Sequence, residues 1–275
     1  MNRCLWASIV LFSALGVPVF AHADCPVPDT GIPEDAAHHI DVAGMRKALA
    51  ENGIGIGGFY AAETFANPVG GFKQGATHDG VLELHRDGDL KKWGFWKGLC
   101  FHVNGFQIHG QSITADNVGS LATISSLEAT PATRLYELWL EQSMFNEHLR
   151  VRFGQLVADG DFFVIEGGDY FLNAWGWPSI TSADLPSGGP GYPLATPGVR
   201  VILSPNDKFD LKVGLYNGDP AGPNCKGDPQ VLRSSIPVGH CSRTSNTSPS
   251  PAETCRMQAG QVPLQMQSFL VFAPP

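Results

Sequence analysis

The stretch Leu135-Tyr136-Glu137-Leu138-Trp139-Leu140-Glu141-Gln142 alternates between apolar and polar residues with a period of two. Successive side chains of a β-strand point to opposite faces, so this period predicts a strand with two unlike faces. One face holds Tyr136, Leu138 and Leu140, and the other holds Glu137, Trp139 and Glu141. The same pattern is typical of a soluble sheet, whose apolar face is the core, and of a membrane barrel, whose apolar face meets lipid.

A second alternating stretch follows after a short turn. In residues 148–153, Arg150 and Arg152 share one face, and the apolar residues Leu149, Val151 and Phe153 share the other. A turn centred on residues 145 and 146 would pair Glu141 with Arg150 and Trp139 with Arg152. A register slipped by two residues keeps both Glu side chains, both Arg side chains and Trp139 on one face.

Two interpretations of this hairpin remain open. It is either a surface ladder of salt bridges, each contributing less than about 1 kcal/mol, or the wall of a wet lumen. In the second case, carboxylates and guanidinium groups would bind sugar hydroxyls, and Trp139 would stack on the apolar face of a sugar ring.

Further strands are predicted on both sides of the hairpin. The candidate ranges are 54–66, 78–87, 98–110, 118–129, 134–143, 148–157, 198–204 and 208–217. Most of them have about the 9–11 residues that a tilted strand needs to cross a bilayer. In 98–110 the apolar phase slips by one residue at Gly105, which predicts a β-bulge there.

The N-terminal region predicts export. Residues 1–23 combine Arg3, an apolar run and Ala21-His22-Ala23, as in a cleaved signal peptide. Residues 24–52 form a helical segment, with Asp41 as N-cap and Asn52-Gly53 as stop signal. No later stretch is long and apolar enough for a transmembrane helix. Five cysteines remain after cleavage, an odd number, and we expect Cys100 to be unpaired in its strand.

Two regions depart from the strand pattern. Residues 157–197 form a long connection that is rich in aromatic residues and is expected to fold onto another part of the molecule. Residues 230–275 have one acidic residue, repeated Ser, Thr and Pro, and a single strand-like piece at 268–272, so we expect a divergent, poorly ordered tail.

Composition and motifs exclude several functions. The 275 residues carry 18 Lys and Arg against 26 Asp and Glu, a net charge of −8, which argues against nucleic acid as a partner. Residues 53–58 match G-x-G-x-x-G, but a helix precedes them and a strand follows, the reverse of a dinucleotide site. Glu137 and Glu141 lie roughly 13 Å apart along a strand, too far for a glycosidase pair. We expect no enzyme, no cofactor and no metal site, and interpret His102 and His109 as ordinary polar residues.

Several separated motifs resemble the carbohydrate-selective porin (OprB) family. They are residues 135–142, Leu149-Arg150-Val151-Arg152-Phe153-Gly154-Gln155, 159–163, Phe171-Leu172-Asn173, Gly176-Trp177-Pro178, 192–198, Tyr216-Asn217-Gly218-Asp219-Pro220 and, upstream, 103–110. The resemblance runs in colinear order from about residue 40 to residue 228. It implies an all-β fold, a transmembrane antiparallel barrel of about sixteen strands in the bacterial outer membrane.

The family resemblance also implies a function and site residues. Such porins pass glucose and related sugars by passive diffusion, are surrounded by outer-membrane lipid and are inserted by the barrel-assembly machinery. The channel lining would fall to Glu137, Trp139, Glu141, Arg150 and Arg152. The aromatic residues of an inward-folded loop would be Tyr170, Trp175 and Trp177.

The resemblance covers only part of a porin. We count about eight strands, in residues 53–229, and the resemblance ends near Gln230, so we expect a truncated, N-terminal half of a porin barrel. A secreted or periplasmic β-rich carbohydrate-binding protein is the alternative, and a periplasmic glycosidase is a third possibility.

Overall fold

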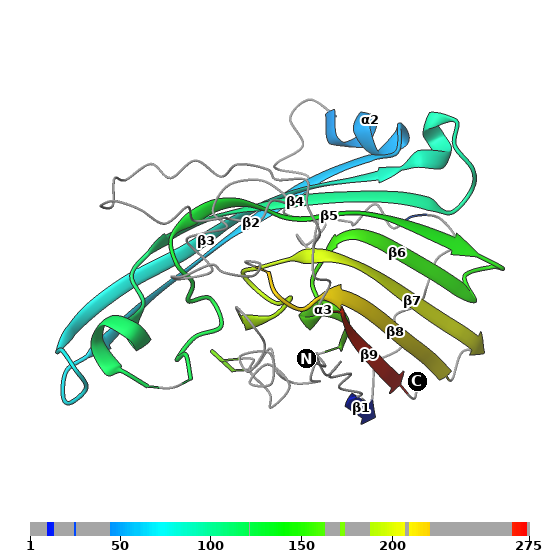
Figure 1. Ribbon diagram of the computed structural model, residues 1–275. Coiled ribbons are helices and arrows are strands. Elements are labelled where there is room, and N and C mark those ends of the chain that lie inside the picture. Colours follow the sequence, from blue (N-terminus) through cyan, green and yellow to red (C-terminus); the bar gives the residue numbers. More distant parts are fainter. Residues whose placement is uncertain are drawn as a thin grey trace, which may run out of the picture.

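A computed structural model describes residues 10–13, 25, 45–120, 122–162, 171–173, 188–206, 209–220 and 266–273. Its strands are β1 (Val10–Ser13), β2 (Ile54–Asn67), β3 (Gly75–Asp89), β4 (Leu99–Gly110), β5 (Ala132–Met144), β6 (Leu149–Leu156), β7 (Thr196–Asn206), β8 (Phe209–Asn217) and β9 (Met266–Ala273). Its helical elements are α2 (Met45–Glu51), the 3-10 turn η2 (Leu90–Trp93), the π-helical turn η3 (Thr114–Val118) and α3 (Asp159–Phe162). The all-β fold predicted from the alternation is therefore confirmed (Figure 1).

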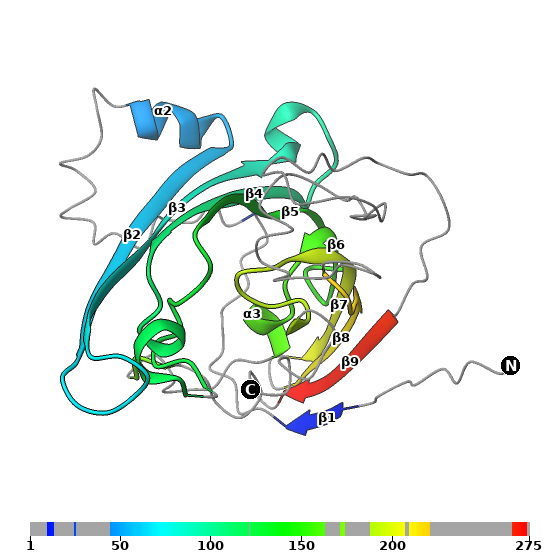
Figure 2. The ribbon, with the colours of Figure 1, turned by 60° about the vertical axis from the view of Figure 1, so that its left-hand side comes forward.

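The strands form one nine-stranded sheet in the order β1-β9-β8-β7-β6-β5-β4-β3-β2. From β2 to β8 each strand pairs antiparallel with its sequence neighbour, whereas β1 pairs parallel with β9. The sheet curls around α3, but within the described residues its edge strands β1 and β2 do not pair with each other (Figure 2). It is an open, strongly curved section of a barrel.

One face of the sheet, called the inner face below, is covered by α3 and by two segments. The β4–β5 segment (residues 111–120 and 122–131) and residues 188–195 pack there on a cluster around Val81, Phe106, Ile108 and Tyr136. Phe162 of α3 packs on Tyr216 beside Leu156. The long connection after β6 therefore does fold onto the sheet, as its aromatic content predicted, in the parts that the structure describes.

A register shift lies where the β-bulge was predicted, but the extra residue belongs to β5. Strand β4 keeps one register with β3 throughout. Val103 pairs with Leu138 and Gly105 with Leu135, so three steps along β5 match two along β4. The apolar phase slips in β4 because Phe106 faces the inner cluster, whereas Phe101 faces the opposite side.

The bulge decides which residues of β5 face inward. Before it, Arg134 and Tyr136 are buried on the inner face, and after it Glu141 is buried there instead. The side-chain amide oxygen of Asn104, opposite the bulge, accepts a hydrogen bond of 2.7 Å from the backbone N–H of Glu137. The bulge thus brings the odd-numbered polar residues of the Glu137–Glu141 stretch to the inner face.

The β5–β6 hairpin has a four-residue turn, Phe145–His148, with φ values of 54°, 52° and 70° at its first three positions. Glu141 pairs with Arg152, and Ser143 pairs with Arg150. The pairing of Glu141 with Arg150 is therefore wrong by two residues, because the turn is longer than the one assumed. The slipped register is the one observed, and it keeps both arginines on the inner face.

Two further sequence-based expectations are wrong. The strand predicted at 118–129 does not form, because η3 and a loop occupy this range, with backbone N–H groups bonded to the Glu128 carboxylate. Cys100 is not unpaired: it forms a disulfide with Cys25, 75 residues away.

The predictions for the N-terminal helix and for the C-terminal tail have different outcomes. Helix α2 ends where the Asn52-Gly53 signal predicted, and Gly53 has φ 75°. The expected N-cap, Asp41, lies outside the described residues. In the predicted poorly ordered tail, residues 268–272 do form a strand, as part of β9.

Candidate functional site

The inner face of β3 to β7 carries a continuous series of contacting polar side chains, called the inner-face network below. Its members are Glu83, His85 and Asp87 on β3, His102 on β4, Trp139 and Glu141 on β5, Arg152 on β6, Arg200 on β7 and Asp161 on α3. Cross-strand register places them, because Asp87, His102 and Trp139 lie in one row across the sheet. Glu141, Arg152 and Arg200 lie in the next row.

The arginine half of the network is built on Glu141. One carboxylate oxygen of Glu141 accepts a hydrogen bond of 2.8 Å from Nε of Arg152 and another from the Arg200 guanidinium. Arg200 is only 3% exposed, and it also bonds the carboxylate of Asp161 on α3. Glu141 and Asp161 together therefore balance the charges of Arg152 and Arg200, and Arg200 links α3 to the wall of the sheet.

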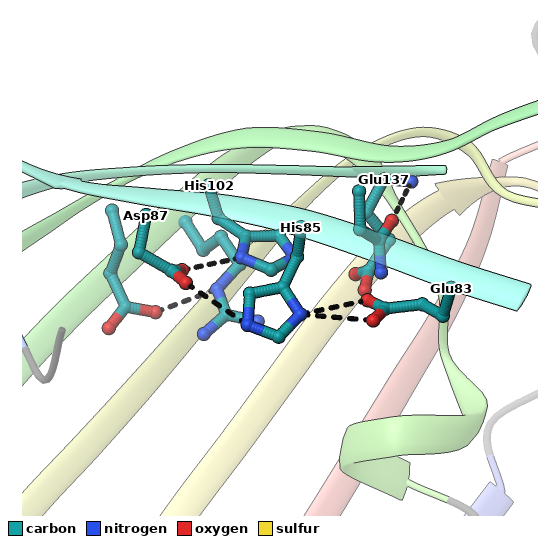
Figure 3. Close-up of polar contacts among 8 residues, drawn as sticks. Glu83, His85, Asp87, His102 and Glu137 are labelled. Carbon is teal, nitrogen blue, oxygen red and sulfur yellow. Dashed lines mark hydrogen bonds and ion pairs between the residues drawn. The ribbon is translucent and has the colours of Figure 1, made fainter. Parts of the chain in front are cut away.

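The histidine half lies on β3 and β4 (Figure 3). Nδ1 of His102 lies 2.6 Å from Asp87, and Nδ1 of His85 lies 3.0 Å from Glu83. Nε2 of His85 approaches Asp87 at 3.9 Å. Each histidine thus has a carboxylate partner, and Asp87 contacts both rings.

Trp139 joins the two halves. Its ring stacks on His102, with centroids 4.8 Å apart, and the Arg152 guanidinium carbon lies 3.7 Å from its ring centroid. Because His102 and Arg152 come from the strands on either side of β5, both faces of the indole are covered. The buried indole N–H has no hydrogen-bond partner among the described residues.

The other predicted site residues are placed as follows. Glu137 lies on the inner face (Figure 3), and its backbone N–H rather than its carboxylate makes the bond to Asn104. Arg150 faces inward beside Ile202, and its Nε is buried without a partner in the described part of the chain. Tyr170, Trp175 and Trp177 lie outside the described residues.

Sequence reasoning missed more than half of the network: Glu83, His85, Asp87, His102, Arg200 and Asp161 as members of one site. The available signal was alternation, because His85 and Asp87 are two residues apart, as are Cys100, His102 and Asn104. The interpretation of His102 as an ordinary polar residue overlooked that its strand lies beside Trp139.

Residues 188–195 cover part of the inner face. The hydroxyl of Tyr192 donates to the carbonyl of Leu127 at 3.1 Å, and its backbone N–H donates to the carboxylate of Asp159 at 2.7 Å. Arg134 donates to the carbonyl of Pro193. Burial raises the pKa of Asp159, although backbone N–H groups of Tyr192 and Gly160 act in the opposite direction. These bonds hold the segment against the sheet and the β4–β5 segment.

The β4–β5 segment is organised around the Glu128 carboxylate. It accepts bonds from both the backbone N–H and the hydroxyl of Thr114, from the Ser112 hydroxyl, and from the backbone N–H groups of Ile124 and Ser125. Burial acts to raise the pKa of Glu128, but the bonds from Ser112, Thr114 and Ser125 outweigh it and hold the pKa below 4.5.

Glu128→Gln is therefore expected to lower the free energy of local opening of the β4–β5 segment by about 2 kcal/mol, because charge-assisted hydrogen bonds to the carboxylate are lost. Since the folded-state pKa is depressed, the ionised group stabilises the segment above pH 4.5, and this stabilisation is lost as the pH falls through the folded-state pKa. Hydrogen exchange at the amides of Ile124 and Ser125 measures both effects. Unchanged exchange rates in the variant would contradict the assignment.

Gly154 lies directly opposite Trp139 and leaves room for its backbone. It has φ 141°, and a Cβ there would meet the Leu138 carbonyl oxygen and lie 2.7 Å from Cα of Trp139. We expect Gly154→Ala to destabilise the fold by about 2–3 kcal/mol. Urea unfolding checks this against Gly160→Ala, where the added methyl meets only one atom, at 4.0 Å. Equal stability of the two variants would contradict the packing described.

Two kinds of feature are absent from the described residues. No group of three or more His, Cys, Asp or Glu side chains in the described ranges is arranged to hold a metal ion. No helix among the described residues combines the length and apolar character required to cross a membrane.

Comparisons with known proteins agree on one family. The model of the carbohydrate-selective porin, OprB family, matches residues 73–247. Porin B of Pseudomonas aeruginosa is 31% identical over 169 residues, which is 58% of this chain and 35% of Porin B. A high-pH structure of Pseudomonas putida OprB superposes with a TM-score of 0.56 at 20% identity, covering 66% of this chain and 44% of that one. The chain therefore spans less than half the length of these two relatives.

Proposed function

The chain belongs to the carbohydrate-selective porin (OprB) family. We therefore propose that it forms part of the wall of an outer-membrane channel for passive diffusion of glucose and related monosaccharides. The sugars pass along the inner face, and lipid surrounds the other face. The proposal includes no catalytic reaction and no cofactor.

The observation that carries the proposal is that the apolar side of the sheet is the exposed one. Leu84, Leu138 and Phe153 face away from the inner face and are 60%, 42% and 47% exposed. Charged Arg200 and Glu141 are buried on the inner face. A soluble sandwich would bury the apolar side, whereas a barrel wall in a membrane turns it to lipid. This arrangement favours a porin over the secreted carbohydrate-binding protein.

The inner-face network suits neutral sugars. Its carboxylates accept hydrogen bonds from sugar hydroxyls, and its guanidinium groups donate to sugar oxygens. Because the positive and negative groups are paired, they offer hydrogen-bonding atoms to a sugar without presenting one strong net charge. The network therefore favours passage of the sugar rather than tight binding of it. We propose Glu137, Glu141, Arg150 and Arg152 as channel-lining residues. Both faces of the Trp139 ring are covered, one by His102 and the other by Arg152, so its proposed role is to hold Arg152 in position.

We propose Tyr170, Trp175 and Trp177 as further channel-narrowing aromatic residues of the same connection as α3. Residues 1–23, which include β1, direct export and are removed, so that β9 becomes an edge strand of the exported sheet, and barrel-assembly machinery inserts the chain. The lengths of the connections between strands support an orientation of the sheet in the membrane. The connections at residues 90–98 and 145–148 are short and would face the periplasm, whereas those at residues 111–131 and 157–195 are long and would face outward. Outer-membrane barrels have short periplasmic turns and long outer loops. We also propose that the open sheet is one section of a larger barrel.

Sugar influx into liposomes tests this function. The chain without residues 1–23 is reconstituted, and uptake of radiolabelled glucose is compared with uptake by empty liposomes and with uptake of a large dextran. Faster entry of glucose and no entry of dextran is the expected result. Glucose entry equal to that of empty liposomes would contradict it.

A further inference from the structure

Away from the inner-face network, two carboxylates face each other across the β2–β3 pair. Glu63 on β2 and Asp79 on β3 are register partners, and Thr77 lies two residues from Asp79 on the same face of β3. Directly opposed residues of antiparallel strands have Cβ atoms about 4.5–5.5 Å apart, and like charges in this position destabilise a sheet. A compensating positive charge would therefore stabilise the pair.

No described Lys or Arg side chain forms an ion pair with either carboxylate, and the imidazole of the neighbouring His78, which acts on Asp79 through space, contacts the hydroxyl of Thr64 instead. Oε2 of Glu63, Oδ2 of Asp79 and Oγ1 of Thr77 are all buried and have no hydrogen-bond partner, and neither carboxylate forms an ion pair in the part of the chain that the structure describes. Asp79 and Thr77 are each only 6% exposed. Buried charges are normally paired or coordinate a metal.

We propose that Glu63, Thr77 and Asp79 bind a divalent hard cation, and that this cation is Ca²⁺. All three free atoms are oxygens, the ligand type that Ca²⁺ takes, and Ca²⁺ tolerates irregular geometry, whereas Mg²⁺ requires near-ideal octahedral geometry. Two carboxylates neutralise both ionic charges. Water would complete the coordination, so the site resembles weak extracellular sites, with Kd on the order of 10⁻⁴–10⁻³ M.

The location gives the ion a structural task. Strand β2 is an edge strand, joined to β3 by residues 68–74. The carbonyl of Asn117 in η3 accepts bonds from the backbone N–H groups of Phe72 (2.7 Å) and Lys73 (3.0 Å). An ion between β2 and β3 would replace carboxylate repulsion with attraction and stabilise this end of the sheet. The inference does not depend on sugar passage.

Calorimetric titration of the purified chain in detergent with CaCl₂ tests the site. We expect saturable binding by the wild type, weakened roughly tenfold or more in Asp79→Asn and Glu63→Gln, which remove ligand charge. Thr77→Val removes only the hydroxyl and is expected to weaken binding, whereas Thr77→Ser keeps it. Asp116→Asn removes an exposed carboxylate from η3 and is the matched control, with unchanged affinity expected.

Thermal unfolding separates binding from folding. Ca²⁺ is expected to raise the melting temperature of the wild type and of Asp116→Asn. Asp79→Asn is expected to melt higher than the wild type in the absence of Ca²⁺, because the repulsion is gone, and to show no response to the ion. Absence of saturable Ca²⁺ binding by the wild type, or wild-type affinity in Asp79→Asn, would overturn the proposal.

Discussion

Replacing Glu141 with alanine is expected to lower the free energy of unfolding by about 3 kcal/mol, because it leaves buried guanidinium charge without its carboxylate. Arg200 is 3% exposed and, among the described residues, retains Asp161 as its one ion-pair partner, and Arg152 loses the bond from its Nε. Urea unfolding of the folded chain in detergent measures the change. Glu141→Gln is expected to fall between alanine and the wild type, since the amide oxygen still accepts one bond.

A double-mutant cycle shows whether the loss comes from the ion pair. Arg200→Met combined with Glu141→Ala is expected to cost less than the sum of the two single changes, because the double variant removes both members of the Glu141–Arg200 ion pair and so does not leave either of these two charges without the other. Asp116→Ala, at an exposed position, is the control and should change stability little. Additive effects of the two network changes would contradict the coupling between β5 and β7.

Loss of the Cys25–Cys100 disulfide is expected to have an effect of similar size. The bond closes a loop with a sequence separation of 75 residues. On the chain-entropy model, removing a crosslink of this span destabilises a protein by about 4 kcal/mol. Cys100→Ser should therefore unfold at lower urea concentration than the wild type, and dithiothreitol should shift the wild type to the same midpoint.

Combining substitutions tests whether Cys25 is the disulfide partner of Cys100. Cys25→Ser, Cys100→Ser and the double variant should have the same unfolding midpoint, because each removes one and the same bond. A double variant that is less stable than either single variant would show that the two cysteines act separately, against the pairing described.

Local alternation was sufficient to predict most strands and the shared face of Glu137, Trp139 and Glu141, whereas the side of the sheet on which this face lies was implied only by the family resemblance. It succeeds at residues 135–142 because a strand with one polar and one apolar face has a period of two whatever its neighbours are. It also predicted that Arg150 and Arg152 share a face with Glu141. It failed at 118–129, where the decisive interaction is the side chain of Glu128 bonded to Thr114 and Ser125, which a periodic pattern does not register.

The remaining features depend on contacts between distant residues. His102 and Trp139 stack although they are far apart in sequence, and Arg200 reaches Glu141 across β6. The bulge could be located at residues 103–105 from the slip in β4, but assigning the extra residue to β5 requires the pairing itself. The boundaries at residues 23, 52 and 229 stay predictions, as does cleavage of the signal peptide.

The most direct test of the account compares two neighbouring residues of β5 that face opposite sides of the sheet. Glu137 lies on the inner face, whereas Leu138 faces outward and is 42% exposed. In the glucose-influx measurement, Glu137→Trp is expected to slow entry several-fold, because a bulky ring fills the path, and Leu138→Trp is expected to leave entry unchanged. Equal slowing by both variants, or slowing by Leu138→Trp alone, would contradict passage of sugars along the inner face.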